Sequence, residues 1–246
     1  MKSDCRAAPH PTDKTGPSNH RCPAFAFNLC CALKPDVNGV TAADRHAQDV
    51  DVPARRTIWR ERTGVDGVPI VCQGWAATVA TTSDGRRQVL SILLPGDLVS
   101  AVLVSEPVIK FAVEAITDVR YRLFRRADVK AALARDPAAL AALSKQWSEE
   151  SARAVQLAID LGQRSAPERI ARLILNLADR LARRGLMRER TLDFPLRHHH
   201  IADATGLTPV HAGKVLSEFR RAGLLEITDR SLTLSNPDEL RRIAML

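Results

Sequence analysis

The spacing of apolar positions changes along the chain, and each change predicts a different kind of structure. From about Arg55 to Arg125, short β-prone runs such as "VPIVCQGWAATVAT" and "RQVLSILL" are separated by turn residues. Asp84-Gly85 lies between two of these runs and indicates a β-hairpin, because both central residues of a type I′ turn need positive φ. Several short strands with tight turns predict a β-sandwich or a barrel.

After Asp136-Pro137 the period becomes helical, because aspartate is a favourable N-cap and proline suits the first helical position. Seven positions then recur at alternating spacings of three and four, and six of them are apolar. This pattern is typical of a helix that packs against a second copy of itself, and a long helix packed only on its own barrel is the alternative. The seven positions are Leu140, Leu143, Trp147, Glu150, Ala154, Leu157 and Leu161.

The segment "SAPE", Ser165 to Glu168, fits a capping box and starts a further helix with one apolar face that ends near Gly185. Because one helix ends and the next begins between Gly162 and Ser165, we expect a hinge between two domains there.

Three consecutive histidines, His198, His199 and His200, raise the question of a metal site. Neighbouring residues on a helix point about 100° apart, so these three side chains cannot all face one ion from a helix. The chain also contains no HExxH or CxxC spacing that would supply further ligands. We therefore expect no metal site at the triplet.

A helix–turn–helix explains the same region better. Residues 201–204 give a first helix an apolar side, Gly206 supplies the turn, and Thr208-Pro209 starts a second helix. The second helix would bury Ala212, Val215, Leu216 and Phe219, and its opposite face is small, polar and basic, which suits the major groove of DNA. An ordinary solvated helix face is the alternative. Two short strands around Asp229-Arg230 and a last helix capped by Asn236 complete the pattern of a winged domain.

Composition and charge narrow the function classes. The net charge of +8 favours polyanionic partners. No apolar run reaches the roughly 20 residues that span a bilayer, and the first residues lack the apolar core of a secretory signal, so we expect a cytoplasmic protein without membrane contact. No nucleophile–base pairing, Gly-rich phosphate loop or metal-ligand cluster is visible, so we do not expect an enzyme.

The segments "TIWRERTGVDGVPIVCQGWAATVATTSDGRRQVLSILLPGDL", "RSAPERIARLILNLADRL" and "FPLRHHHIADATGLTPVHAGKVLSEFRRAGLLEI" resemble the CRP/FNR family of bacterial transcription regulators. The resemblance covers about residues 50–246. It implies an α+β fold with an eight-stranded jelly-roll sensor barrel of the cyclic-nucleotide-binding type, a long dimerisation helix and a C-terminal winged helix–turn–helix. The expected boundaries are 1–50 for a partly disordered arm, 51–130 for the barrel, 131–163 for the dimerisation helix and 164–246 for the DNA-binding domain.

The resemblance also implies partners and a site. Double-stranded DNA with a palindromic operator would be bound by a homodimer formed through the 138–161 helix, and RNA polymerase is a further implied partner. Arg197, His198 and His199 match positions that face the phosphate backbone, while Lys214 would reach a guanine and Val210 a thymine methyl group. The full set of expected DNA-binding residues is Arg197, His198, His199, Thr208, Val210, His211, Gly213, Lys214, Ser217 and Arg221.

Two departures from the family pattern affect what is bound. Asp97 stands where the cyclic-nucleotide members carry a phosphate-site glutamate, and no arginine follows before Arg120, so we do not expect cAMP to bind. In the second helix Val210, Gly213 and Lys214 replace the residues that read the operator in the founding members. The operator sequence therefore cannot be transferred from them.

The cysteines suggest an alternative function. Oxygen sensors of this family hold an iron–sulfur cluster with three N-terminal cysteines and one in the barrel, but the founder's close cysteine pair is missing here. The first candidate ligands are Cys22, Cys30 and Cys31. The alternative is therefore a redox or ligand sensor that acts mainly through a protein partner, and ordinary thiols remain the other interpretation. The chain's five cysteines are Cys5, Cys22, Cys30, Cys31 and Cys72.

Overall fold

Seven strands form two antiparallel sheets in the computed structural model of the chain, which describes Leu33 and residues 46–245. One sheet has the order β1-β7-β3 and the other β2-β6-β4-β5. Apolar residues of both sheets, Val71, Val113 and Val119 among them, pack together between the sheets. The strands are β1 Gln48–Val52, β2 Thr57–Trp59, β3 Val68–Gln73, β4 Ala76–Thr81, β5 Arg87–Leu93, β6 Ala112–Ala115 and β7 Val119–Phe124.

The expected eighth strand has no counterpart in the described part of the barrel, where Gly64 and Val108 form an isolated bridge. Apart from Leu33, the predicted arm falls outside the described residues up to position 45, and so do the candidate cluster ligands Cys22, Cys30 and Cys31.

The hairpin predicted at Asp84-Gly85 is confirmed, but its turn type was wrong. The ladder ends at the pair Thr81–Arg87, so five residues connect β4 to β5. Of the two turn residues only Gly85 has positive φ, at +84°. Asp84 instead uses its carboxylate to accept hydrogen bonds from Thr82 and Arg86, which stabilises the longer connection without a second left-handed residue.

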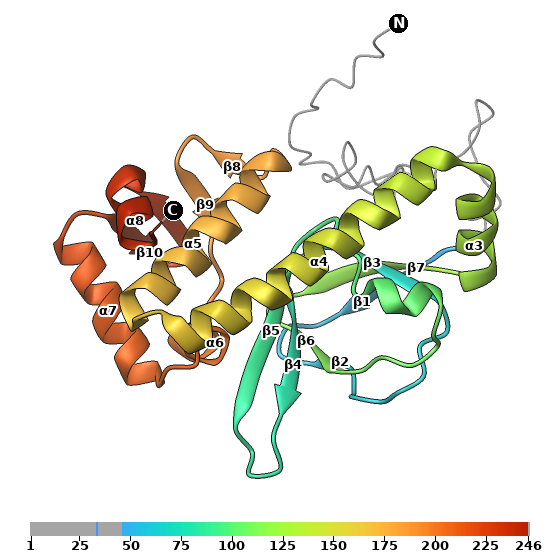
Figure 1. Cartoon of the computed structure of the whole chain (residues 1–246), viewed down its shortest axis with the longest axis horizontal. Helices are drawn as coiled ribbons and strands as arrows, with labels where there is room; N and C mark the ends of the chain where they lie inside the picture. Colours follow the sequence, from blue (N-terminus) through green and yellow to red (C-terminus); the bar gives the residue numbers. More distant parts are fainter. Residues whose placement is uncertain (1–32, 34–45, 246) are drawn as a thin grey trace, which may run out of the picture.

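Helix α4, Pro137–Gln163, runs from α3, Arg126–Arg135, along the barrel to the C-terminal domain (Figure 1). Asp136 caps it as predicted, since its carboxylate accepts a hydrogen bond from the Ala138 amide at 2.9 Å. The exposed apolar stripe of α4 differs from the predicted seam. It consists of Leu140, Trp147, Val155 and Ile159, which are 51%, 52%, 61% and 43% exposed.

Four members of the predicted seam face the protein itself. Leu143 is buried in the core between the barrel and the helices, and Glu150 accepts hydrogen bonds from Ser100 and Ala101 of the barrel. Leu157 and Leu161 line a cavity between α4, β5 and the C-terminal domain. The heptad pattern did not separate them from the exposed residues, because α4 has apolar residues on two faces and spacing alone does not distinguish an intramolecular face from an exposed one.

The C-terminal domain follows the predicted winged pattern. The capping box is confirmed, because the Ser165 amide donates to Glu168, and Asn236 accepts from the Glu239 amide as the predicted cap of the last helix. The wing belongs to a four-stranded sheet of order β10-β11-β9-β8, whose strands β8 and β9 the sequence did not reveal. The elements are α5 Ala166–Arg183, β8 Met187–Arg188, β9 Thr191–Asp193, α6 His198–Thr205, α7 Pro209–Arg221, β10 Leu225–Thr228, β11 Ser231–Leu234 and α8 Pro237–Ile243.

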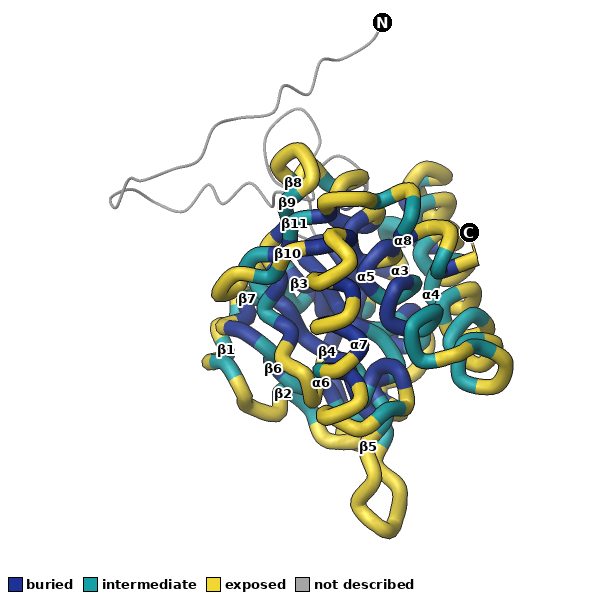
Figure 2. Tube along the Cα trace, turned by 90° about the vertical axis from the view of Figure 1, so that its left-hand side faces the viewer, coloured by how far each residue is buried: buried dark blue, intermediate teal, exposed yellow. Residues whose placement is uncertain are grey.

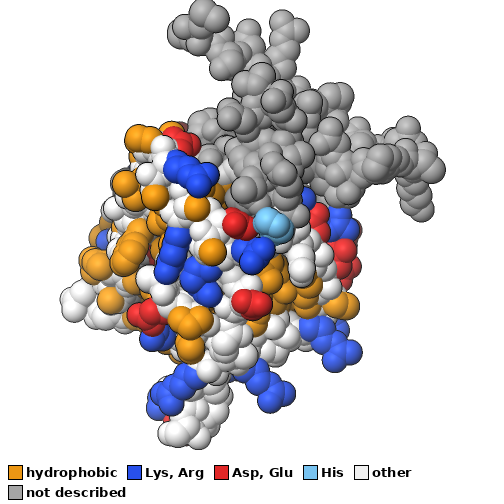
Figure 3. Space-filling view, turned by 90° about the vertical axis from the view of Figure 1, so that its right-hand side faces the viewer, with side chains coloured by type: hydrophobic (Ala, Val, Ile, Leu, Met, Phe, Trp, Pro, Cys, Tyr) orange, Lys and Arg blue, Asp and Glu red, His pale blue; other side chains and the backbone are white. Residues whose placement is uncertain are grey.

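The barrel and the C-terminal domain share one apolar core. Trp75 and Ile92 of the barrel belong to the same buried cluster as Ile170 and Leu177 of α5, and buried residues run through both parts (Figure 2). On the side of the molecule beyond α3, charged side chains of both signs are interspersed with apolar ones (Figure 3). Within the described residues, no helix is long and apolar enough to span a membrane.

Candidate nucleic-acid interface

Helix α7 is held by one buried stripe and presents the opposite face. Thr208 caps the helix by accepting a hydrogen bond from the His211 amide at 3.2 Å, and Pro209 occupies the first helical position. Gly206, at φ +66°, ends α6 in the left-handed region and allows the turn between the two helices. The predicted buried stripe is confirmed, and its members are Ala212, Val215, Leu216 and Phe219.

The outward face of α7 carries the residues predicted to read DNA. Val210 is 84% exposed, and Lys214, Ser217 and Arg221 follow on the same exposed face. An apolar side chain this exposed, next to a lysine, is better suited to contact base edges in a groove of DNA than to remain in water. Three cations against the single acidic residue Glu218 give α7 a net charge of +2 from its sequence.

The start of α6 separates the three histidines into different roles. Arg197, His198 and His199 are exposed, whereas His200 turns back and accepts a hydrogen bond from the Arg197 amide at 3.0 Å. His200 thus acts as the third-position acceptor of a capping box in which Arg197 is the N-cap residue. Burial, with the nearby His199 and Arg197 adding to it, lowers the pKa of His200 to about 4, so its ring is neutral at pH 7. No group of His, Cys, Asp and Glu side chains within the described residues is arranged to hold a metal ion.

Gly213 lies beneath the ring of His198. A Cβ atom at Gly213 would lie 3.1 Å from Nδ1 and 3.2 Å from Cε1 of His198. The absence of a side chain at Gly213 therefore lets α6 approach α7, and the imidazole of His198 packs directly against α7. Ser217 also has an intramolecular bond, since its hydroxyl donates to the Gly213 carbonyl at 2.9 Å. Of the ten predicted residues, these two have packing roles that sequence spacing did not indicate.

A buried ion cluster joins the barrel to the C-terminal domain. Asp97, after β5, accepts hydrogen bonds from Arg180 and Arg184 of α5 at 2.5 Å each, and from the Leu94 amide. Asp97 therefore faces α5, and both of its carboxylate oxygens are engaged by arginines. Burial alone would raise the pKa of Asp97, but the two guanidiniums and the hydrogen bonds keep it below the usual value.

A second contact between the domains involves the β4–β5 hairpin. Arg87 donates two hydrogen bonds to Glu114 and lies 3.4 Å from Asp203 of α6. The sequence analysis identified neither the Asp97 contact nor the Arg87 contact. The one signal in the sequence concerned the Asp97 contact: Arg180 and Arg184 lie four residues apart, on the same side of a helix that is otherwise apolar there.

The start of the short helix η1, Ala101–Val104, has donors that a bound anion would need. Both are used by the chain itself, because Glu150 of α4 accepts from the Ser100 hydroxyl at 3.2 Å and from the Ala101 amide at 3.0 Å. The contact connects the long helix directly to the barrel.

Comparison with known proteins places these features in a family. Residues 168–243 match the family model "Crp-like helix-turn-helix domain", and residues 49–136 match "Cyclic nucleotide-binding domain". The nitrogen fixation regulation protein FixK of Rhizobium meliloti is 32% identical over 162 residues, which cover 65% of this chain and 70% of FixK. The transcriptional activator protein FnrL of Cereibacter sphaeroides is 30% identical over 166 residues, 66% of each chain. The solved structure of FixK2 from Bradyrhizobium japonicum is similar with a TM-score of 0.71 and 27% identity, covering 80% of this chain and 96% of FixK2.

Proposed function

The chain belongs to the CRP/FNR family of DNA-binding transcription regulators, and from this premise we propose that it binds a two-fold symmetric operator as a homodimer in the cytoplasm. The observation that carries the proposal is the outward face of α7, where Val210 and Lys214 stand exposed on a helix fixed by its buried stripe. The protein acts by binding DNA, and its partner at the promoter is RNA polymerase, whose transcription the bound regulator changes.

Each part of the motif has a proposed task on the duplex. Lys214 donates to a guanine and Val210 contacts a thymine methyl group, while Thr208, His211 and Ser217 lie along the groove walls. Gly213 acts indirectly, through the position of His198. The phosphate contacts, which orient the domain without reading sequence, come from Arg197, His198, His199 and Arg221.

The exposed stripe of α4 is the proposed dimer contact. Leu140, Trp147, Val155 and Ile159 expose large apolar surfaces along one helix, and a parallel copy of α4 would bury them. Pairing of two α4 helices would place the two recognition helices about 34 Å apart, in successive major grooves. In this arrangement the barrel, 51–130, and the DNA-binding domain, 164–246, flank the 131–163 segment.

Selection from a random double-stranded DNA library tests the proposal. The full-length chain is expected to enrich a motif with two inverted half-sites about one helical turn apart. The affinity for the enriched duplex, measured by fluorescence anisotropy, should exceed the affinity for a shuffled duplex by about 10³-fold or more. Enrichment of no symmetric motif, with equal salt-dependent affinity for both duplexes, would contradict it.

A further inference from the structure

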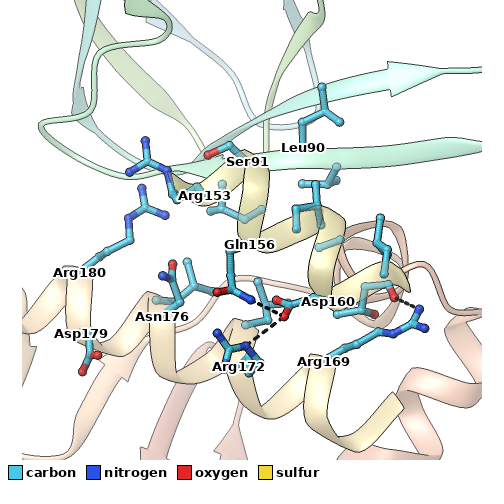
Figure 4. A pocket seen from close by; sticks show the side chains of 18 residues that line it. Leu90, Ser91, Arg153, Gln156, Asp160, Arg169, Arg172, Asn176, Asp179 and Arg180 are labelled. Carbon is cyan, nitrogen blue, oxygen red and sulfur yellow. Dashed lines mark hydrogen bonds and ion pairs between the residues drawn. The ribbon is translucent and has the colours of Figure 1, made fainter. Parts of the chain in front are cut away.

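A cavity of about 240 Å³ lies where β5 of the barrel meets α4, α5 and α6 (Figure 4). Its two ends differ in chemistry. Ser91, Arg153 and Arg180 gather at one end, where the guanidiniums of the two arginines approach each other near the serine hydroxyl. Much of the remaining wall is apolar and comes from Ile92, Leu157, Leu161, Leu173 and Leu177.

The polar end has donors that the protein leaves unused. Ser91 Oγ, Arg153 Nε and Arg180 Nε are buried, and none has a hydrogen-bond partner among the described residues. The Arg180 side chain is only 6% exposed. Buried donors without acceptors cost free energy, so three of them around one cavity indicate an acceptor that the chain does not supply.

The same end has an excess of positive charge. The single charge of Asp97 is shared between Arg180 and Arg184, and Arg153 has a 4.0 Å contact with Glu149. Burial lowers the pKa of Arg180 to about 10, and the charge of Arg153 adds to the effect although Asp97 opposes it. Of the two acidic residues that line the cavity, Asp160 at the other end is already paired with Arg164 and Arg172, and Asp179 is exposed on α5.

We propose that this cavity binds a small organic anion, a carboxylate with an apolar ring or branched body. The carboxylate would accept hydrogen bonds from Arg153, Arg180 and Ser91, and its body would contact the leucines. Since a cavity of about 150 Å³ accommodates benzene, the larger volume here suits a ring with one carboxylate.

Occupancy of the cavity is coupled to the arrangement of the domains, an inference that rests on the proposed DNA-binding function. Ser91 and Ile92 belong to the barrel, while Arg180 and Leu177 belong to the DNA-binding domain. A ligand that contacts both sides binds the docked arrangement more tightly than an undocked one, and so shifts the population toward it.

Benzoate is the probe for a direct test with the full-length protein by isothermal titration calorimetry. We expect saturable binding with a Kd of about 1 mM, and binding at least about tenfold weaker for benzyl alcohol, which has no charge. Inorganic phosphate tests whether the apolar wall contributes, and it should also bind at least about tenfold more weakly than benzoate. Equal binding of phosphate and benzoate would overturn the assignment to an organic anion.

Two variants locate the site. Arg153→Gln and Ser91→Ala should each weaken benzoate binding, the first by about tenfold or more, while Arg183→Gln, on the exposed side of α5, should leave it unchanged. Absence of benzoate binding, or equal binding by Arg153→Gln, would overturn the proposal. Affinity for the selected operator is measured separately. Operator binding without benzoate binding would contradict only the anion-site proposal, whereas benzoate binding without operator binding would contradict only the proposed DNA-binding function.

Discussion

Arg180 on α5 donates to Asp97 on the turn after β5 at 2.5 Å, and both side chains are more than nine-tenths buried. Arg184 donates to the other carboxylate oxygen. One carboxylate therefore connects the barrel to the DNA-binding domain in a region that water hardly reaches. Burial makes the contact sensitive to loss of a partner, because the charge that remains has no solvent to stabilise it.

Asp97→Asn should reduce the free energy of unfolding by about 3–5 kcal/mol, because two buried guanidiniums lose their anion. Urea denaturation followed by circular dichroism measures the loss. Asp66→Asn is the matched control on the exposed surface of the barrel, and it should change stability by less than about 0.5 kcal/mol. A loss of under about 1 kcal/mol at Asp97 would show that the pair contributes little.

The free energy of unfolding should decrease as the pH is lowered from about 6.5 to about 4, because of His200. In the unfolded chain this histidine takes up a proton near pH 6.5, whereas in the folded chain its pKa is about 4. The unfolded state therefore binds more protons than the folded state within this window. The resulting loss in the free energy of unfolding is about 1–2 kcal/mol, a value lowered because His200 is partly exposed to solvent.

His200→Gln keeps an acceptor for the Arg197 amide and removes the titration. Urea denaturation at several pH values should then show a shallower decline of stability with falling pH than in the wild-type chain. The same slope in His200→Gln and wild type would assign the pH dependence to other groups.

Gly213→Ala tests the packing of His198 on α7. Alanine favours a helix by about 1 kcal/mol over glycine, but its Cβ would press on the imidazole at 3.1 Å. The stabilisation should therefore be smaller than the helix propensity predicts, or be reversed, in the wild-type background. In a His198→Ala background the full gain should appear, and a double-mutant cycle should give a coupling of about 0.5–1 kcal/mol. Strict additivity of the two changes would exclude the contact.

Lys214→Ala should weaken binding to the selected operator by about 1–3 kcal/mol and relax the preference at one base pair of each half-site. Lys130→Ala removes the same charge from the exposed face of α3 and should leave operator affinity unchanged. Anisotropy titrations on the operator and on single-base variants provide the measurement. A uniform loss across all sequences would instead place Lys214 on a phosphate.

Trp147→Glu should convert the proposed homodimer to monomers, because it places a charge in the middle of the exposed stripe of α4. Sedimentation velocity over a range of concentrations measures the change. Phe111→Glu alters a comparably exposed apolar residue of the barrel, 44% against 52%, and should leave the dimer intact. Dimers of unchanged affinity in Trp147→Glu would place the contact elsewhere.

Local chemistry made much of the fold predictable. Asp136, Ser165, Thr208 and Asn236 were recognisable as caps because a cap acts on amides two or three residues away. The recognition helix was predictable for a similar reason, since the apolar stripe that includes Val215 repeats with the period of one helix. The helices of the winged helix–turn–helix and their starts therefore follow from the sequence alone, whereas strands β8 and β9 do not.

Contacts between distant segments followed only from the tertiary structure. Asp97 and Arg180 are 83 positions apart, and no local pattern relates them. The same limit applied to Glu150, predicted in a dimer seam but bonded to the barrel, and to Gly213, whose smallness accommodates His198. Sequence spacing shows which residues share a face, whereas only the packing of the barrel against α4 and α5 decides which faces are buried, which charges meet and where a cavity remains.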